Sequence, residues 1–331
     1  MRDQLKSLQE TYQEHFSIGA AVSPKTLGTS RKLILNHFNS ITAENAMKFV
    51  EVHPAPGHYD FSRADAIMDF AKAHEKQVRG HTLVWHNQTS EWVFEGDRGT
   101  QVTRAELLER MQAHIHTVMN RYKGQIYAWD VVNEAIADHG DKDLRQSKWL
   151  EIIGPDFIDK AFELAHEADP EALLFYNDYN ETNPEKRKKI IRLVQGLQQK
   201  GVPIHGVGLQ AHWNIYGPSI DAIRLALDDY AALGLAIHIT ELDISVFRFD
   251  DHRKDLTAPT KEMLEQQAKM YENVFALFRD YDQHIHNVTL WGVADDHTWL
   301  DNFPVRGRKN WPLLFDQYHR PKESFCRLVD F

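Results

Sequence analysis

Two glutamates stand at the ends of apolar runs, where their carboxylates could do chemistry. The run 127–135, YAWDVVNEA, ends just after Asn133 and Glu134, and the run 236–243, AIHITELD, carries Glu241 near its end. Buried parallel strands are near-continuous apolar runs, and α/β barrels bind ligands at the carboxyl ends of their strands. Two carboxylates there are what acid–base and nucleophilic attack on a glycosidic bond require. The alternative is that each glutamate only pairs with an arginine or caps the next helix.

Eight strand-like runs alternate with helical stretches, which predicts a parallel sheet. No linker rich in Pro, Gly or Ser separates the chain into halves. We therefore predict an α/β fold, one closed (β/α)8 barrel, with residues 1–331 as a single domain. The predicted strands are Phe16–Val22, Ser40–Asn45, Gln77–Trp85, Ile126–Glu134, Leu173–Tyr179, Gly206–His212, Ala236–Asp243 and Asn287–Val293.

Three long segments follow predicted strands and should be loops on the face made by the carboxyl ends of the strands. The 331 residues exceed the roughly 250 typical of the barrel. The excess falls in residues 87–103, 245–260 and 294–321. Extended loops on that face commonly shape a substrate cleft, although a charged loop is by default only solvated.

Composition excludes several classes of partner. With 48 Asp and Glu against 38 Lys and Arg, the net charge of −10 opposes nucleic-acid binding. No apolar run is long enough to cross a bilayer, so we expect no membrane partner. The single cysteine, Cys326, excludes an intramolecular disulfide and is best interpreted as a small apolar filler. Because residues 1–16 are charged and lack the apolar core of a secretion signal, we expect a cytoplasmic location.

Polar and aromatic residues gather at the carboxyl ends of the predicted strands. They should lie close together in a barrel, although they are far apart in the sequence. Carboxylate, amide, imidazole and ammonium groups can hydrogen-bond hydroxyls, while Trp85, Trp291 and Trp299 offer flat apolar surfaces. Sugars present both demands, whereas Trp129 and Trp149 are better explained by core packing. The polar residues at these ends are Glu44, Asn45, Lys48, His81, His86, Asn177, Asp178, Tyr179, Gln210 and His212.

A metal site is the competing explanation for a chain with 19 histidines. The pair His114 and His116 falls in a helical stretch, and the pair His284 and His286 precedes the last predicted strand instead of ending it. His81 and His212 are placed at strand ends, but they lie among residues that suit hydroxyl binding better than metal ligation. We therefore expect no metal.

At these positions the sequence closely resembles the endo-1,4-β-xylanases of glycoside hydrolase family 10. The resemblance covers nearly the whole chain and rests on several motifs in order, each at its own strand end. The motifs are Thr42-Ala43-Glu44-Asn45 with Lys48, Gly80-His81-Thr82-Leu83-Val84-Trp85-His86, Trp129-Asp130-Val131-Val132-Asn133-Glu134, Asn177-Asp178-Tyr179-Asn180, Gln210-Ala211-His212, Ile239-Thr240-Glu241-Leu242-Asp243 and Trp291-Gly292.

The resemblance implies a retaining endo-1,4-β-xylanase that needs no cofactor and acts on xylan and xylan-derived oligosaccharides. It implies that Glu134 is the acid/base and Glu241 the nucleophile, and that Tyr179 lies on the aglycone side. The residues implied to line the glycone subsites are Glu44, Asn45, Lys48, His81, Trp85, Gln210, Trp291 and Trp299. Unlike many members of the family, this chain is expected to have no secretion signal and no appended carbohydrate-binding module.

A retaining mechanism needs Glu134 protonated and Glu241 ionised, so their surroundings must separate the two pKa values. We expect neighbouring negative charge to do this, with His212 and Asp243 orienting and charge-balancing Glu241. Asn133 is placed to hydrogen-bond the sugar 2-hydroxyl.

Two alternatives remain open. Another retaining β-1,4-glycanase, such as a cellulase, would use the same pair of glutamates, and room for a C6 hydroxymethyl would distinguish it. We expect Trp291 and Trp299 to crowd that group. A non-catalytic sugar-binding barrel is the other alternative, and a turnover assay separates it from an enzyme.

Overall fold

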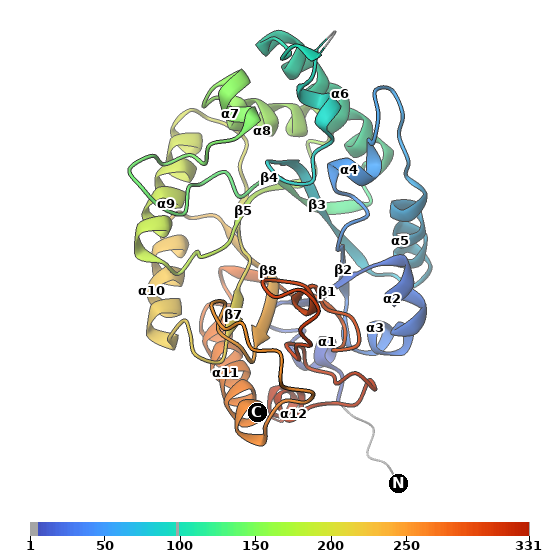
Figure 1. The fold of residues 1–331 in the computed structure, drawn as a ribbon, viewed down its shortest axis with the longest axis vertical. Helices are drawn as coiled ribbons and strands as arrows, with labels where there is room; N and C mark the ends of the chain where they lie inside the picture. The colour runs from blue at the N-terminus through green and yellow to red at the C-terminus, as the bar shows by residue number, and fades with distance from the viewer. Residues whose placement is uncertain (1–5, 97–98, 331) are drawn as a thin grey trace.

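Residues 6–96 and 99–330 are described by a computed structural model, and within them eight parallel strands close into a barrel (Figure 1). The closed order is β1, β2, β3, β4, β5, β6, β8, β9 and back to β1, because β6 pairs with β8 and β1 with β9. The predicted (β/α)8 barrel is therefore confirmed. The strands are β1 Ser17–Val22, β2 Ser40–Ala43, β3 Gln77–Trp85, β4 Ile126–Asn133, β5 Leu173–Asp178, β6 Gly206–Leu209, β7 His212–Asn214, β8 Ala236–Ser245 and β9 Ile285–Leu290.

The predicted strands are right in place, and the differences lie at their ends. The run 206–212 is divided into β6 and β7, because Ala211 has φ 59°, a left-handed conformation that cannot continue a strand. β7 pairs instead with the far end of β8, which runs on to Ser245. β9 begins at Ile285, so His286 lies within the strand and does not precede it as predicted.

Helices surround the barrel, and their ends follow ordinary capping chemistry (Figure 1). Thr103 and Glu106 form a capping box at the start of α6, while Asn183 caps α9 ahead of Pro184. Among the described residues, no helix is long and apolar enough to span a membrane. The helices are α1 Leu8–Thr11, α2 Pro24–Thr29, α3 Arg31–His37, α4 Phe49–Val52, α5 Ser62–Ala73, α6 Arg104–Arg121, α7 Lys148–Ile153, α8 Phe157–Ala168, α9 Pro184–Gln199, α10 Ile220–Ala231, α11 Lys261–Asp280 and α12 Glu323–Val329, with short 3₁₀ turns at Glu91–Phe94 and Trp299–Asp301.

The three long loops follow β3, β8 and β9, at the carboxyl ends of these strands, as predicted. Residues 97 and 98 of the first loop lie outside the described residues. Trp129 and Trp149 are each 1% exposed, which confirms them as core residues.

A buried ion pair supports the face on which the strands end. Arg79 of β3 makes a two-pronged contact with Asp130 of β4, and both side chains are almost fully buried. Asp130 also lies 2.9 Å from Nδ1 of His81, whose ring packs edge-on against Trp291 at a centroid distance of 5.3 Å. Because a buried pair with complete hydrogen bonding is costly to break, it holds His81 in one orientation.

Candidate active site

Glu134 directly follows β4 in a strained backbone conformation. Its φ is 57°, a region that costs an L-residue other than glycine about 1–2 kcal/mol. A main-chain hydrogen bond to Asn177 O, 2.9 Å long, helps to hold it there. The carboxylate accepts hydrogen bonds from Trp85 Nε1 at 2.9 Å and from Gln210 Nε2 at 3.1 Å. Backbone strain of this kind is typical of functional positions.

Glu241 lies inside β8 and is 5% exposed. Its Oε1 accepts a hydrogen bond from Asn177 Nδ2 at 2.8 Å, and its Oε2 lies 3.3 Å from His212 Nε2. The other ring nitrogen of His212 lies 3.0 Å from Asp243, which also accepts a hydrogen bond from Trp299 Nε1 at 2.8 Å. The nucleophile candidate is therefore held on both oxygens.

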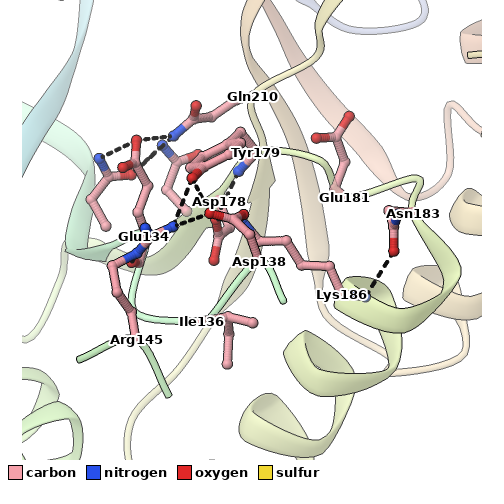
Figure 2. A network of polar contacts seen from close by, with 12 residues as sticks. Glu134, Ile136, Asp138, Arg145, Asp178, Tyr179, Glu181, Asn183, Lys186 and Gln210 are labelled. Carbon is pink, nitrogen blue, oxygen red and sulfur yellow. Dashed lines mark hydrogen bonds and ion pairs between the residues drawn. The ribbon is translucent and has the colours of Figure 1, made fainter. Parts of the chain in front are cut away.

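A chain of side-chain amides connects the two glutamates. Gln210 Nε2, which binds Glu134, also donates to Asn133 Oδ1 at 3.2 Å. Asn177 Nδ2 donates to the same oxygen at 2.9 Å and to Glu241 at 2.8 Å. These amides come from the ends of β4, β5 and the segment after β6, so the fold brings Glu134 and Glu241 into one site. Figure 2 shows Gln210 beside Glu134.

The surroundings move the pKa values of the two glutamates in opposite directions. Burial is the largest influence raising the pKa of Glu134, followed by the negative charge of Asp178, while the charge of Glu241 has a smaller effect. We expected neighbouring negative charge to be the main cause of the raised pKa of Glu134. That expectation is wrong, because the loss of hydration on burial has a larger effect than the charges. Its raised pKa favours the protonated form.

Glu241 has a lowered pKa. Burial would raise it, but a hydrogen bond from His212 and the charges of His81 and His212 outweigh burial. Burial would likewise lower the pKa of His212, but the charge and contact of Asp243 and the contact with Glu241 raise it to about 10. His212 is therefore an imidazolium at neutral pH, and Glu241 is ionised beside it.

The predicted glycone-side residues gather beside these glutamates. Lys48 Nζ donates to Asn45 Oδ1 at 2.9 Å and to Gln88 Oε1 at 3.0 Å, and it lies 5.1 Å from the ring centre of Trp85. The charges of Glu241, Glu44 and Glu134 all act on Lys48, which is 7% exposed. Lys48 therefore lies within electrostatic reach of both glutamates.

Three further predicted residues contact neighbours on this side of the site. Glu44 lies 3.1 Å from Nε2 of His297, a residue of the loop after β9. Trp291 is 6% exposed and has its ring 6.3 Å from that of His212. Trp299 is closer to His212, with ring centres 4.8 Å apart.

Tyr179 belongs to a polar network near Glu134 that the sequence did not reveal (Figure 2). Its hydroxyl donates to Asp138 Oδ2 at 2.5 Å and accepts from Arg145 Nη2 at 2.7 Å. Lys186 Nζ lies 3.5 Å from the centre of its ring. Asp138 and Arg145 belong to the loop after β4 and Lys186 to α9, and their sequence surroundings resemble those of ordinary surface charges. Asn177 was predicted as a polar residue at a strand end, but no role for it followed from the sequence.

The described residues contain no group of three or more His, Cys, Asp or Glu side chains arranged to hold a metal ion. His114 is instead stacked on Phe49, with ring centres 3.6 Å apart. The arrangement around Glu134 and Glu241 can supply a protonated acid and an ionised nucleophile side by side.

Comparison with known proteins agrees with this chemistry. Residues 7–331 match the family model described as Glycosyl hydrolase family 10. An endo-1,4-beta-xylanase of Geobacillus stearothermophilus is 58% identical over 332 residues, which cover 100% of each chain. The crystal structure of xylanase XynB from Paenibacillus barcinonensis, complexed with a conduramine derivative, is 57% identical and covers 99% of each chain with a TM-score of 0.97. A mutant structure in complex with xylotriose is 52% identical, covers 98% of this chain and 99% of its own, and has a TM-score of 0.96.

Proposed function

Because this chain belongs to glycosyl hydrolase family 10, we propose that it is a retaining endo-1,4-β-xylanase. Its substrates are the internal β-1,4 bonds of xylan and xylo-oligosaccharides. The observation that carries this function is the pair of glutamates joined by hydrogen-bonded side-chain amides. The pKa of Glu134 is shifted upward and that of Glu241 downward. Relatives that cover the whole chain and are named endo-1,4-beta-xylanases support the choice of xylan.

In the first step, the Glu241 carboxylate attacks the anomeric carbon while Glu134 gives its proton to the departing glycosidic oxygen. The glycosidic bond breaks and a glycosyl ester of Glu241 forms. The charge of Glu241 is then gone, which removes one of the influences that raise the pKa of Glu134. In the second step Glu134 takes a proton from water, the water oxygen attacks the anomeric carbon, and Glu241 leaves as a carboxylate.

We assign Asn133 to the 2-hydroxyl of the sugar at this bond. Its Oδ1 is already occupied by Asn177 and Gln210, so its Nδ2, 3.3 Å from Glu134 Oε1, is the group left to face substrate. A hydrogen bond to the 2-hydroxyl that strengthens in the transition state would add several kcal/mol of stabilisation.

We assign the preference for xylose over glucose to Trp291 and Trp299, which both border His212. A glucose unit carries a C6 hydroxymethyl that these two rings would crowd. The test compares release of products from xylohexaose and cellohexaose, with the Glu134→Ala, Glu241→Ala double variant as the blank. Turnover of xylohexaose alone supports the proposal. Equal turnover of both substrates would indicate a broader β-glycanase, and turnover of neither would indicate a binding protein.

We also propose that the protein acts in the cytoplasm, on short xylo-oligosaccharides. The single cysteine, Cys326, is compatible with a reducing compartment, since the fold uses no disulfide among its described residues. Fractionation of the source cells, with detection by antibody, tests this location, and recovery from the culture medium would refute it.

A further inference from the structure

We propose that Arg145 is a positioning residue for the acid, tying the backbone of Glu134 to Tyr179 on the aglycone side. This inference rests on the proposed function, in which Glu134 protonates the leaving group. Arg145 Nε donates to the main-chain carbonyl of Glu134 at 3.0 Å, and its Nη2 donates to Tyr179 and to Asp138. Figure 2 shows the guanidinium between these groups. A guanidinium suits this role because its N–H donors point in different directions within one rigid plane.

The loop that carries Arg145 is itself fastened to the residue after Glu134. Arg145 N donates to Ala135 O at 2.7 Å, and Ala137 N donates to Asp143 O at 2.8 Å, so the segments 135–137 and 143–145 pair as a short antiparallel ladder. Arg145 therefore touches both Glu134 and Ala135. Because Glu134 is held at φ 57°, loss of these contacts leaves its strained backbone free to relax.

A charge-balanced cluster keeps the guanidinium in place. Lys186, 1% exposed, lies 2.7 Å from Asp138 Oδ1 and 2.8 Å from Asp178 Oδ1. Burial alone would raise the pKa of Asp138, but hydrogen bonds from Lys186 and Tyr179 and the charges of Lys186 and Arg145 lower it to about 2. Two carboxylates thus face two cations, and Asp138 stays ionised beside Arg145 throughout the neutral range.

The cluster also fixes Tyr179, so one set of contacts places both the acid and the surface under the leaving sugar. Burial raises the pKa of Tyr179, which keeps its hydroxyl protonated and able to donate to Asp138 while accepting from Arg145. A shift of about 1 Å between an acid and its leaving group can cost about a hundredfold in rate. Arg145 itself need not touch the substrate to have this effect.

The test uses two aryl xylobiosides of similar shape that differ in their need for an acid. Phenyl β-xylobioside has a poor leaving group and requires a proton, whereas 2,4-dinitrophenyl β-xylobioside does not. Arg145→Met should lower kcat/KM for the phenyl substrate by about tenfold to a hundredfold, with a loss of less than about threefold for the dinitrophenyl substrate. Arg145→Lys should shift the ratio in the same direction by less, because one ammonium cannot serve all three acceptors.

Lys189 supplies the matched control. It lies on α9 like Lys186, is buried, and donates to the carbonyls of Gly140 and Lys142 at the tip of the same loop, at 2.6 Å and 2.9 Å. Lys189→Met should lower the melting temperature without changing the ratio between the two substrates.

Equal losses on both substrates in Arg145→Met would overturn the inference, provided that Glu134→Ala shows the selective loss. If Arg145→Met does not fold, Arg145→Lys is judged by the same ratio. If Glu134→Ala itself shows no selective loss, the proposed function fails and not only the role of Arg145.

Discussion

At the scale of single residues, environment gives two chemically similar side chains different roles. Glu134 and Glu241 both carry a carboxylate and both bind the same chain of amides, but only Glu241 is in contact with a charged imidazole. Glu134 instead has Asp178 as a charged neighbour, and the negative charge of Asp178 raises the pKa of Glu134. This asymmetry supports the proposed roles, with Glu134 as the acid and Glu241 as the nucleophile.

Truncating each glutamate should separate the two roles. Glu134→Ala should lose on the order of 10²–10⁴ in kcat/KM on xylan, yet still form the intermediate from an activated aryl xylobioside, whose leaving group needs no proton. Azide should then restore turnover by attacking the intermediate, with a β-glycosyl azide as the product. Glu241→Ala should be inactive on both substrates. If the two variants behaved alike toward the activated substrate, the assignment of roles would be wrong.

The acid side of the pH profile should depend on Asp243. Its charge raises the pKa of His212 to about 10, and charged His212 lowers the pKa of Glu241. Asp243→Asn removes the charge that keeps the buried His212 ring protonated, so burial leaves this ring neutral even on the acid side of the profile. Glu241 then loses its charged partner, its pKa rises, and the acid limb of kcat/KM should move upward.

Asp65→Asn is the control for this experiment, since Asp65 pairs with Arg121 between α5 and α6, away from the site. Its acid limb should match the wild type. An acid limb in Asp243→Asn that stayed in place or moved downward would contradict the role given to His212.

At the scale of elements, strand packing places the amide that joins the two glutamates. Gly208 of β6 leaves room for Asn177 of β5: a Cβ at Gly208 would lie 2.2 Å from Asn177 Oδ1. Asn177 is also held by Thr240, whose hydroxyl donates to the same oxygen at 2.7 Å. The side chain cannot move aside without breaking its contacts with Asn133 and Glu241.

Gly208→Ala should therefore damage catalysis more than folding. Overpacking of this kind costs about 1–3 kcal/mol of stability, and displacement of Asn177 should lower kcat by about tenfold to a hundredfold. Gly206→Ala on the same strand is the matched comparison, because its Cβ would meet Phe175 at 2.0 Å and not Asn177. Thermal melts and xylohexaose kinetics on both variants measure this. If Gly208→Ala and Gly206→Ala lost the same amount of activity for a given loss of stability, the catalytic role assigned to Asn177 would be refuted.

The sequence predicted elements and strand-end residues well, because both leave local signals. Apolar runs mark the buried strands, and a polar residue at the end of such a run is conspicuous, as with Glu134 and Gln210. Contacts between elements leave no such signal. Arg145 is one charge in a charged loop and Lys186 one lysine in a lysine-rich helix, so only the packing of α9 against the loop after β4 reveals their connection. The division of the predicted strand 206–212 at Ala211 was missed for a similar reason, since an alanine in the sequence does not indicate a left-handed backbone.

At the scale of the whole molecule, the barrel and its loops set the length of substrate that can be used. The residues proposed for the glycone and aglycone subsites lie close to the two glutamates, and the proposed cytoplasmic location implies short substrates. A cleft adapted to short chains should gain little from each xylose beyond the few nearest the cleaved bond. We expect kcat/KM to plateau early from xylotriose to xylohexaose and insoluble xylan to be a poor substrate. A steep continued rise with length, or efficient release of sugar from the insoluble polymer, would refute this expectation.

The central claim, that Glu241 forms a covalent bond to the sugar, can be tested by trapping that bond. A 2,4-dinitrophenyl 2-deoxy-2-fluoro-β-xylobioside should form the glycosyl-enzyme quickly and release it slowly, because fluorine at C2 destabilises both oxocarbenium-like transition states while the leaving group assists only the first. Peptide mass spectrometry should then find one fluoroxylobiosyl group, on Glu241, with Glu134 unmodified. A label on any other residue, or a protein that turns over substrate and is never labelled, would contradict the account.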